Sequence, residues 1–364
     1  RNGNIMNCYI TGTGSFLPGE AVPNEAIPDF MGELDGEALV RRKILRMNGI
    51  KSRHYALDRA QNPTHDAYEM AALAAAHCLD HKPGTFTYLS AGSTNTPLVG
   101  PGLSSILHAR LARQGIIARP VEINSNSGIC TSGAQALVNA ARAIASGDHQ
   151  EALCIGVEQP SVFLKSSFIR PPDDRALYLD KETSSKWFMS VFLRSMLSDG
   201  AGAVSLRNQP ATDRISYRLN WTYSRSFAHE TPLCMSLESR SLLLSQDVAI
   251  LAKYMRPSVE QLVRGALAQH GESLAEYQCV LPHLSSYFFK AYLLDILTKM
   301  GGGPAIPYWT NLESAGNAGS ASIFIILDEF TRKHTPAHGD KVMLFIPESG
   351  QFNFVLVSLT VVHP

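Results

Sequence analysis

The sequence has little of the material that several classes of protein require. Its six cysteines are spread over 364 residues and include no CxxC pair, so we predict neither a disulfide framework nor a zinc site. Lys plus Arg and Asp plus Glu each number 32, which gives a formal net charge of zero. A chain without net charge has no global attraction for nucleic acid or for an anionic membrane. We therefore expect no nucleic acid, membrane or metal as a partner.

Long apolar runs are missing as well. No stretch approaches the roughly 20 apolar residues that a membrane-spanning helix needs. The first residues, RNGNIMNCYITGTG, lack the apolar core of a signal peptide. These absences predict a cytoplasmic protein. The chain is 45% hydrophobic and 18% charged, a composition that favours a folded core over disorder.

Short apolar runs alternate with longer helical patterns, which is typical of an α/β protein. The runs predict strands at Cys8–Thr11, Thr87–Ala91, Ala152–Val157, Ala203–Leu206, Cys279–Leu281, Ile323–Leu327, Val342–Ile346 and Phe354–Val362. Apolar residues at spacings of three and four predict helices at Asp66–Leu79, Ser104–Ala112, Cys130–Ser146, Pro257–His270 and Tyr287–Met300. The segment Ile323–Leu327 fits a buried helix equally well.

Two segments suggest an internal duplication. ASGDHQEALCIGVE and AHGDKVMLFIPESG each end a helical pattern with Gly-Asp and then begin an apolar strand. The separation of Cys130 from the first turn is similar to that of Asn317 from the second. We therefore predict two similar α/β halves, residues 1–207 and 208–364, joined near residues 207–215.

Three polar residues lie where predicted elements begin or end. Cys130, in NSNSGICTSG, lies at the start of a predicted helix, where the positive end of the helix dipole favours a thiolate. His283, in CVLPHLSSYF, follows a short strand, and Asn317, in ESAGNAGSAS, lies among small residues. Together they could form a site in which a thiol attacks a carbonyl while a base and an amide polarise its partner. Singly, each also fits a structural role, such as a small buried hydrophobe in the case of cysteine.

Five motifs in order resemble those of the thiolase-fold condensing enzymes, specifically the β-ketoacyl synthase III group, and together they span essentially the whole chain. NGIKSRHYA is similar to the TGI-x-x-R-x-x-A motif of that group, and SGICTSGAQAL is similar to its nucleophile motif, A-A-C-x-G-x-x-x-A-L. LSDGAGAVSL resembles F-G-D-G-A-G-A, VLPHLSS matches V-P-H-Q-A-N through the histidine, and SAGNAGSAS matches Y-G-N-T-S-A-A-S.

The resemblance implies a duplicated five-layer α/β/α/β/α thiolase fold and an acyltransferase that usually forms a homodimer. It implies no cofactor apart from the substrates, which are thioesters of coenzyme A or of acyl carrier protein. Cys130, His283 and Asn317 would be the catalytic triad. An acyl group would be carried on Cys130, and its oxyanion would be held by the N–H groups of Cys130 and Gly350. His283 and Asn317 would donate hydrogen bonds to the second thioester during Claisen condensation.

Several positions depart from the motifs of the group. H-Q-A-N is H-L-S-S here, and G-G-G is Ser349-Gly350-Gln351. Gly100 replaces a phenylalanine that lines the acyl pocket across the dimer, which would leave room for a larger or second chain. These departures favour a branch in specialised metabolism, the dialkylresorcinol and stilbene ketosynthase/cyclases, which join an acyl to a β-ketoacyl thioester and close a cyclohexanedione ring. Glu158 is the candidate base for ring closure, although a carboxylate in a structural hydrogen-bond network explains it equally well.

Other functions remain open at this point. They are a plain acyl-primed β-ketoacyl synthase III without cyclisation, a Cys-dependent acyltransferase or hydrolase, and a non-catalytic partner of a condensing heterodimer. The last agrees least with the sequence, since such partners typically lose the nucleophile. The basic stretch VRRKILRMNGIKSR offers Arg42, Arg46 and Arg53 as candidates to bind an acidic carrier protein or the phosphates of coenzyme A. A solvated helix face is an equally good interpretation.

Overall fold

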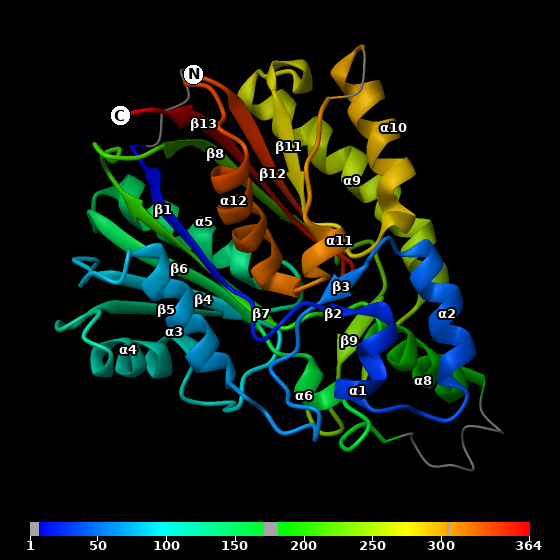
Figure 1. Ribbon diagram of the computed structural model, residues 1–364. Helices are drawn as coiled ribbons and strands as arrows, with labels where there is room; N and C mark the ends of the chain where they lie inside the picture. The colour runs from blue at the N-terminus through cyan, green and yellow to red at the C-terminus, as the bar shows by residue number, and fades with distance from the viewer. Residues whose placement is uncertain (1–6, 171–180, 304–305) are drawn as a thin grey trace.

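The computed structural model describes residues 7–170, 181–303 and 306–364. Its centre is a nine-stranded sheet with the order β11-β12-β13-β8-β1-β7-β6-β4-β5 (Figure 1). The strands are β1 (Tyr9–Phe16), β4 (Tyr88–Ser93), β5 (Glu122–Ser127), β6 (Glu151–Glu158), β7 (Gly200–Arg207), β8 (Ser216–Ser226), β11 (Cys279–Pro282), β12 (Lys341–Glu348) and β13 (Asn353–Val362). Two small pairs lie outside it, β2 (Val22–Pro23) with β3 (Ser52–Arg53) and β9 (Met235–Leu237) with β10 (Leu244–Gln246).

The longer helices are α2 (Glu37–Met47), α3 (Ala67–Cys78), α4 (Leu103–Arg113), α5 (Ser132–Ser146), α8 (Lys181–Arg194), α9 (Val248–His270), α10 (Lys290–Gly301) and α12 (Ser322–Lys333). The short helices of the described residues include α1 (Ile27–Met31), α6 (Ser161–Leu164) and α11 (Leu312–Ala315). Within the described ranges, none of the helices combines the length and the apolar character needed to cross a membrane.

Helices and sheet segments alternate in layers. The alternation of side chains along a strand shows this, because successive residues point to opposite faces. On β6, Ala152 and Cys154 pack into a central apolar cluster that contains α5 and α12, whereas Leu153 and Ile155 pack into an outer cluster with α3 and α4. The strand is therefore covered by helices on both faces.

The other end of the sheet repeats this arrangement. On β12, Leu344 packs into the same central cluster, whereas Met343 and Phe345 pack against α9 and α10. The order of layers is thus α3 and α4, strands, α5 and α12, strands, then α9 and α10 (Figure 1). This arrangement agrees with the predicted five-layer α/β fold.

The strand order separates the two ends of the chain. Strands β1, β4, β5, β6 and β7 occupy one end of the order, and β8, β11, β12 and β13 occupy the other. The two groups meet where β1 pairs with β8 through Tyr9–Arg218 and Ile10–Tyr217. β7 ends at Arg207. The division into halves at residues 207 and 208 stays a prediction.

Several predicted elements need correction. The strand alternative for Ile323–Leu327 is wrong, because this segment belongs to helix α12. Its unbroken apolar character arises because the helix is buried in the central layer. The helix predicted at Pro257–His270 begins earlier, at Val248, where the Asp247 side chain accepts a hydrogen bond from the Ile250 N–H. The helix predicted from Cys130 begins at Ser132.

Strands β5 and β8 and helices α2 and α8 were not predicted. β5 has the polar sequence EINSNS and lies at the edge of the sheet, where Ile123 is 44% exposed. β8 alternates buried and half-buried residues over most of its length. Neither strand contains the continuous apolar run by which the other strands were recognised.

Helices α2 and α8 are joined by a buried ion pair. Arg194 and Glu37 have side chains that are 0% and 1% exposed, and their charged groups are in contact. The Arg194 guanidinium also donates to the Met31 carbonyl oxygen at 2.7 Å. Removal of one partner would leave the other charge buried without compensation.

We expect Arg194→Met to lower the free energy of unfolding by about 3–5 kcal/mol, the cost of breaking a buried ion pair. Urea unfolding monitored by circular dichroism measures this loss. The matched control is Arg59→Met, since Arg59 and Asp29 form an ion pair with side chains that are 71% and 48% exposed. That control should lose no more than about 1 kcal/mol. Equal losses in the two variants would contradict a stabilising role for the buried pair.

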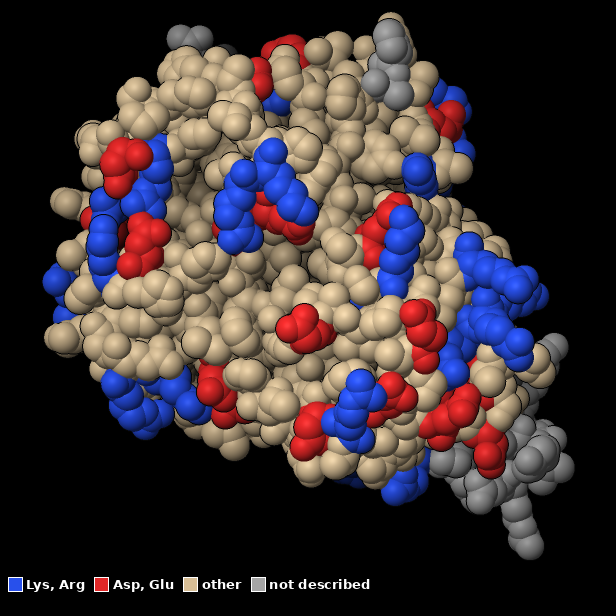
Figure 2. All heavy atoms as spheres, in the orientation of Figure 1, with Lys and Arg blue, Asp and Glu red and all other residues tan. Residues whose placement is uncertain are grey.

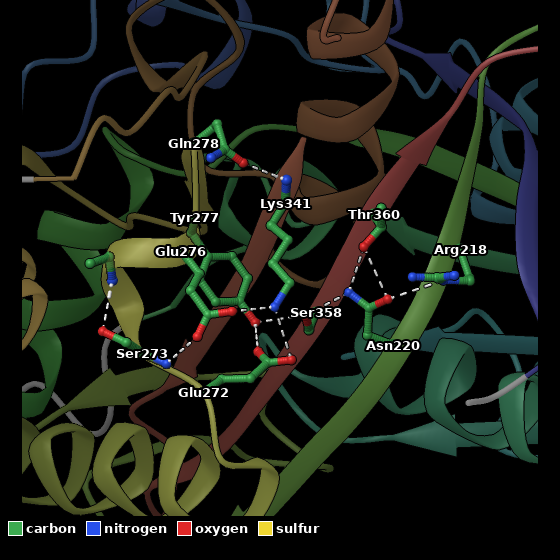
Figure 3. A network of polar contacts seen from close by, with 11 residues as sticks. Arg218, Asn220, Glu272, Ser273, Glu276, Tyr277, Gln278, Lys341, Ser358 and Thr360 are labelled. Carbon is green, nitrogen blue, oxygen red and sulfur yellow. Dashed lines mark hydrogen bonds and ion pairs between the residues drawn. The ribbon is translucent and has the colours of Figure 1, made fainter. Parts of the chain in front are cut away.

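A second polar network connects the end of α9 with the sheet (Figure 3). The Lys341 ammonium contacts Glu272 at 3.2 Å and Glu276 at 2.8 Å. The Tyr277 hydroxyl donates to the Glu272 carboxylate at 2.5 Å and is also hydrogen-bonded to the Ser358 hydroxyl at 2.6 Å. Lys341 begins β12 and Glu348 ends it, so this network lies at the opposite end of the strand from the candidate site described next. We interpret it as structural.

Candidate active site

Cys130 lies in the turn between β5 and α5, two residues before the first residue of the helix. It is 9% exposed. Its side chain lines two neighbouring cavities. The position at a helix N-terminus agrees with the sequence analysis, and it places the sulfur where two separate groups could reach it.

His283 directly follows β11 and is 2% exposed. Its backbone N–H donates to the Phe345 carbonyl oxygen at 2.8 Å, whereas neither ring nitrogen has a hydrogen-bond partner among the described residues. Burial lowers the pKa of His283 to about 4. The imidazole is therefore neutral at pH 7, with one N–H donor and one acceptor nitrogen free for a substrate.

Asn317 lies two residues beyond α11 and is 4% exposed. Its backbone carbonyl oxygen accepts from the Ser198 N–H at 2.8 Å, and its side-chain oxygen accepts from the Gly319 N–H at 2.9 Å. Because the oxygen is occupied, the amide NH2 group remains as the donor. The loop of small residues thus holds Asn317 in one orientation.

The three predicted residues are brought together around the two cavities. The first cavity is lined by Cys130 and His283, with Phe289 and Tyr292 among its apolar residues. The second is lined by Cys130 and Asn317, with several apolar side chains from α6, α8 and the β9–β10 pair. Both cavities share Cys130, Gln246, Ser285 and Ser349. Cys130 is therefore the point at which they meet.

The predicted acidity of Cys130 needs correction. Burial, followed by the negative charges of Glu348 and Glu158, raises the pKa of the Cys130 thiol well above its ordinary value. The backbone N–H of Cys130 acts in the opposite direction but is the smallest influence. The resting site therefore holds a thiol rather than the thiolate that the helix N-terminus alone would favour. Acylation must then remove the thiol proton.

Glu158 ends β6 and is 6% exposed. One of its oxygens accepts from the Thr94 hydroxyl at 2.6 Å and from the Ser320 hydroxyl at 2.7 Å. It also lines the second cavity, together with Cys130 and Asn317. Burial raises the pKa of Glu158 to about 7, against the opposing effect of its hydrogen bonds. Both interpretations of Glu158 thus have support: it belongs to a hydrogen-bond network, and it faces the cavity with acidity suited to proton transfer near neutral pH.

The two glycines assigned to the site have different surroundings. Ser349, rather than Gly350, lines both cavities, and Gly350 is buried beside Glu348 and Ile129. The oxyanion role of the Gly350 N–H stays a prediction. Gly100 lies in an exposed loop, and a Cβ atom there would have open space around it. It lines neither cavity of its own chain, so its predicted role across a dimer stays a prediction.

The three arginines predicted to bind a carrier or coenzyme A differ in their exposure to solvent. Arg42 and Arg46 lie on the exposed face of α2, over which Lys and Arg side chains gather (Figure 2). Arg53 is 0% exposed, and its guanidinium donates to the carbonyl oxygens of Val22 at 3.2 Å and Ser195 at 3.1 Å. The prediction that Arg53 binds a carrier or coenzyme A is therefore wrong, because its side chain is used within the fold.

Sequence reasoning missed the other polar residues of the site. Gln246, Ser285 and Ser349 line both cavities, and the Gln246 amide donates to the Ser349 hydroxyl at 2.9 Å. Glu348, whose negative charge raises the pKa of the Cys130 thiol, was also missed. One signal was available for Glu348: a carboxylate at the end of the apolar strand KVMLFIPE, directly before the Ser349-Gly350-Gln351 segment.

The chain matches no protein-family model. It is 24% identical over 343 residues to β-ketoacyl-[acyl-carrier-protein] synthase III of Xanthomonas oryzae pv. oryzae and to that of Xanthomonas campestris pv. campestris, with 92% of this chain and 93% of each relative covered. Among solved structures, the tetronic acid condensing enzyme AbyA1 has a TM-score of 0.78 at 18% identity, over 97% of this chain and 99% of that one. Synthase III from Pseudomonas aeruginosa has a TM-score of 0.71 at 20% identity, over 97% and 98%. A variant of Xanthomonas campestris OleA has a TM-score of 0.76 at 17% identity, over 98% and 99%.

These comparisons confirm the fold expected from the motifs. The chain has the fold of the thiolase-fold condensing enzymes. Among them, it is similar in sequence to β-ketoacyl synthase III along nearly its whole length.

Proposed function

We propose that this protein is a ketosynthase that carries an acyl group on Cys130 and joins it to a β-ketoacyl or malonyl thioester by Claisen condensation. The observation that carries the proposal is the meeting of two cavities at Cys130, one lined by His283 and the other by Asn317 and Glu158. A condensation needs two chains at one sulfur atom. A hydrolase needs room for only one chain and a water molecule.

In the first half-reaction, the Cys130 sulfur attacks the carbonyl carbon of the acyl thioester. The new C–S bond forms as the bond to the departing thiol breaks. Because Cys130 is a thiol in the resting site, its proton must be transferred as this happens, and it leaves with the departing thiolate as the free thiol of coenzyme A or of the carrier. The backbone N–H groups of Cys130 and Gly350 would hold the oxyanion.

In the second half-reaction, the neutral His283 and the amide NH2 of Asn317 donate hydrogen bonds to the carbonyl oxygen of the second thioester. Its enolate forms by loss of carbon dioxide from a malonyl group or by loss of a proton from a β-ketoacyl group. The enolate carbon attacks the acyl carbonyl, and the Cys130 thiolate leaves and is reprotonated. Both side chains would act as fixed hydrogen-bond donors in a buried site, where they stabilise the negative charge of the enolate.

We further propose that Glu158 is the base for ring closure and that the protein belongs to the specialised-metabolism branch of ketosynthase/cyclases. The carbon between two carbonyl groups is acidic enough for a carboxylate base whose pKa lies near neutrality. Glu158 lines the second cavity and burial raises its pKa to about 7. A folded polycarbonyl chain in that cavity would present this carbon to Glu158, and loss of the proton would allow the ring to close.

Glu158→Gln keeps the shape of the side chain and removes the base. We expect this variant to acylate Cys130 as the wild type does, and to release linear products or lactones in place of a ring. Liquid chromatography with mass spectrometry of the products measures this change. Glu151→Gln, at the other end of the same strand and outside both cavities, should leave the product unchanged. If the wild type gives only linear products from every acyl and β-ketoacyl pair, the cyclase assignment is wrong and a plain ketosynthase remains.

The partners of the proposed enzyme are thioesters of coenzyme A or acyl carrier protein, with no other cofactor, and we propose a cytoplasmic homodimer. The exposed Arg42 and Arg46 lie on α2, which is followed by Asn48. The Asn48 carbonyl oxygen accepts from the Tyr287 N–H at 2.9 Å, close along the chain to Phe289, which lines the first cavity. A phosphate or an acidic carrier held by these arginines would therefore be near the wall of the site.

The direct test of the function is incubation of the protein with paired acyl and second thioesters, followed by mass analysis of the products. A condensing enzyme yields a product that contains both chains. Comparison of malonyl with β-ketoacyl partners identifies the second substrate by the release of carbon dioxide. Free fatty acid as the only product would indicate the Cys-dependent hydrolase instead.

A further inference from the structure

The turn that presents Cys130 is held by one buried carboxylate that the reaction scheme does not use. Glu348 ends β12 and is 7% exposed. One of its oxygens accepts from the backbone N–H groups on either side of the nucleophile, from Ile129 at 3.2 Å and from Thr131 at 2.8 Å. The Thr131 hydroxyl donates to the same oxygen at 2.5 Å. These three donors suit a carboxylate anion, which accepts hydrogen bonds and donates none.

The hydrogen bonds account for the local shape of the turn. Residues 129 and 131 both direct their N–H groups at Glu348, and the Asn353 amide fixes the Thr131 hydroxyl from β13 at 2.8 Å. The Glu348 side chain also lies close to Gly128. A Cβ atom added to Gly128 would lie 3.8 Å from a Glu348 carboxylate oxygen. Glu348 therefore connects the end of one sheet segment to the start of helix α5.

The charge of Glu348 has no nearby positive partner in the site. None of the described residues that line the two cavities is a lysine or an arginine. The titratable groups that act on Cys130 or line a cavity with it are Glu348 from β12, Glu158 from β6, His283 directly after β11 and Tyr292 from α10. A negative charge at the N-terminus of α5 also opposes the helix dipole that would otherwise favour a thiolate.

We propose that Glu348 is a positioning residue for the nucleophile, whose carboxylate both orients the turn around Cys130 and keeps the sulfur in its thiol form before a substrate binds. Alkylation and oxidation of cysteine proceed through the thiolate, so a protonated Cys130 would resist both. The proposal rests on the proposed function only in naming Cys130 as the nucleophile. The reactivity of the thiol can be measured without any substrate.

The test is the rate of alkylation of Cys130 by iodoacetamide at about pH 8, followed at the Cys130 peptide by mass spectrometry. Glu348→Gln keeps an acceptor oxygen for the turn and removes the charge. We expect its rate to rise about tenfold or more, the change in thiolate fraction that accompanies one pKa unit. Glu158→Gln should give a smaller rise, because Glu158 is the lesser of the two electrostatic influences.

Two controls make the result specific. Glu313→Gln removes an exposed carboxylate that pairs with Lys51 at the surface, and its rate should equal that of the wild type. Glu348→Asp keeps the charge and should stay within about twofold of the wild type. An unchanged or lower rate in a folded Glu348→Gln protein would overturn the proposal.

The wild type supplies a measurement that needs no variant. The alkylation rate of its Cys130 should continue to rise up to about pH 9, because the thiol is still mostly protonated there. A rate that is half-maximal at or below about pH 8.5, the ordinary pKa of a free thiol, would overturn the proposal even if the variants failed to fold. Failure of the proposed condensation would leave these alkylation results intact, so the two proposals can fail separately.

Discussion

Cys130→Ala is expected to lose acyl-enzyme formation completely and to lower condensation on the order of 10⁴-fold or more, as removal of a covalent nucleophile does elsewhere. Among the described residues that line both cavities, Cys130 carries the thiol, which is a stronger nucleophile than the hydroxyl groups of Ser285 and Ser349. Intact-protein mass spectrometry after incubation with an acyl thioester shows the added acyl mass directly. The wild type should gain one acyl group, and the variant none.

Cys279→Ala is the matched control for this experiment. Cys279 begins β11, is partly buried and lines neither cavity. This variant should therefore be acylated like the wild type. Acylation of the Cys130→Ala protein at a rate near that of the wild type would remove the thiol mechanism altogether.

His283→Ala and Asn317→Ala are expected to separate the two half-reactions. Both side chains are buried, and the proposed mechanism uses both as donors to the second thioester, so either variant should still form acyl-Cys130 and should lose condensation by about 10²–10³-fold. A quenched-flow experiment with a labelled acyl thioester measures both the initial burst of acylation and the later steady-state rate of condensation. His108→Ala, on α4 and hydrogen-bonded to the Arg119 carbonyl oxygen, should change neither step.

The protonation of His283 gives this prediction a pH dependence. Burial lowers its pKa to about 4, so the neutral donor form is complete near neutrality and is lost as the pH falls through about 4. Because the ordinary pKa of histidine is 6.5, the unfolded chain binds this proton more readily, and the stability that the neutral form contributes declines as the pH falls from about 6.5 toward 4.

Equal loss of acylation and condensation in His283→Ala would mean instead that His283 activates the thiol.

The parts of the fold that could be predicted from the sequence are those whose pattern reflects one local environment. Helices α3, α4 and α5 carry apolar residues at helical spacing, and β4, β6 and β12 are short apolar runs, so each was located to within a few residues. β5 was missed because an edge strand with polar side chains has no apolar run to reveal it. Ile323–Leu327 was ambiguous because α12 lies between two sheet segments and is apolar on several faces.

The candidate site shows the same division. Cys130, His283 and Asn317 could be proposed as site residues because each lies in a short motif at the end of an element, where the chain order alone indicates position. Glu348 and Arg53 depend on contacts between residues far apart in the chain. Glu348 binds a turn more than 200 positions earlier, and Arg53 donates to Ser195 across the fold. The predicted acidity of Cys130 was wrong for the same reason. Burial and a carboxylate far away in the sequence raise the pKa of the thiol more than the local helix dipole lowers it.

The most direct test of the central claim is a chase experiment with an isotopically labelled acyl thioester. The protein is first loaded with the label and freed of excess substrate, so that acyl-Cys130 is the only labelled species. An unlabelled malonyl or β-ketoacyl thioester is then added, and the label is followed by mass spectrometry of the protein and of the released compounds. We predict that the label leaves Cys130 only on this addition and appears in a product that contains both chains joined by a new carbon–carbon bond. Release of the label as free acid at the same rate with and without the second thioester would contradict the assignment of this protein as a condensing enzyme.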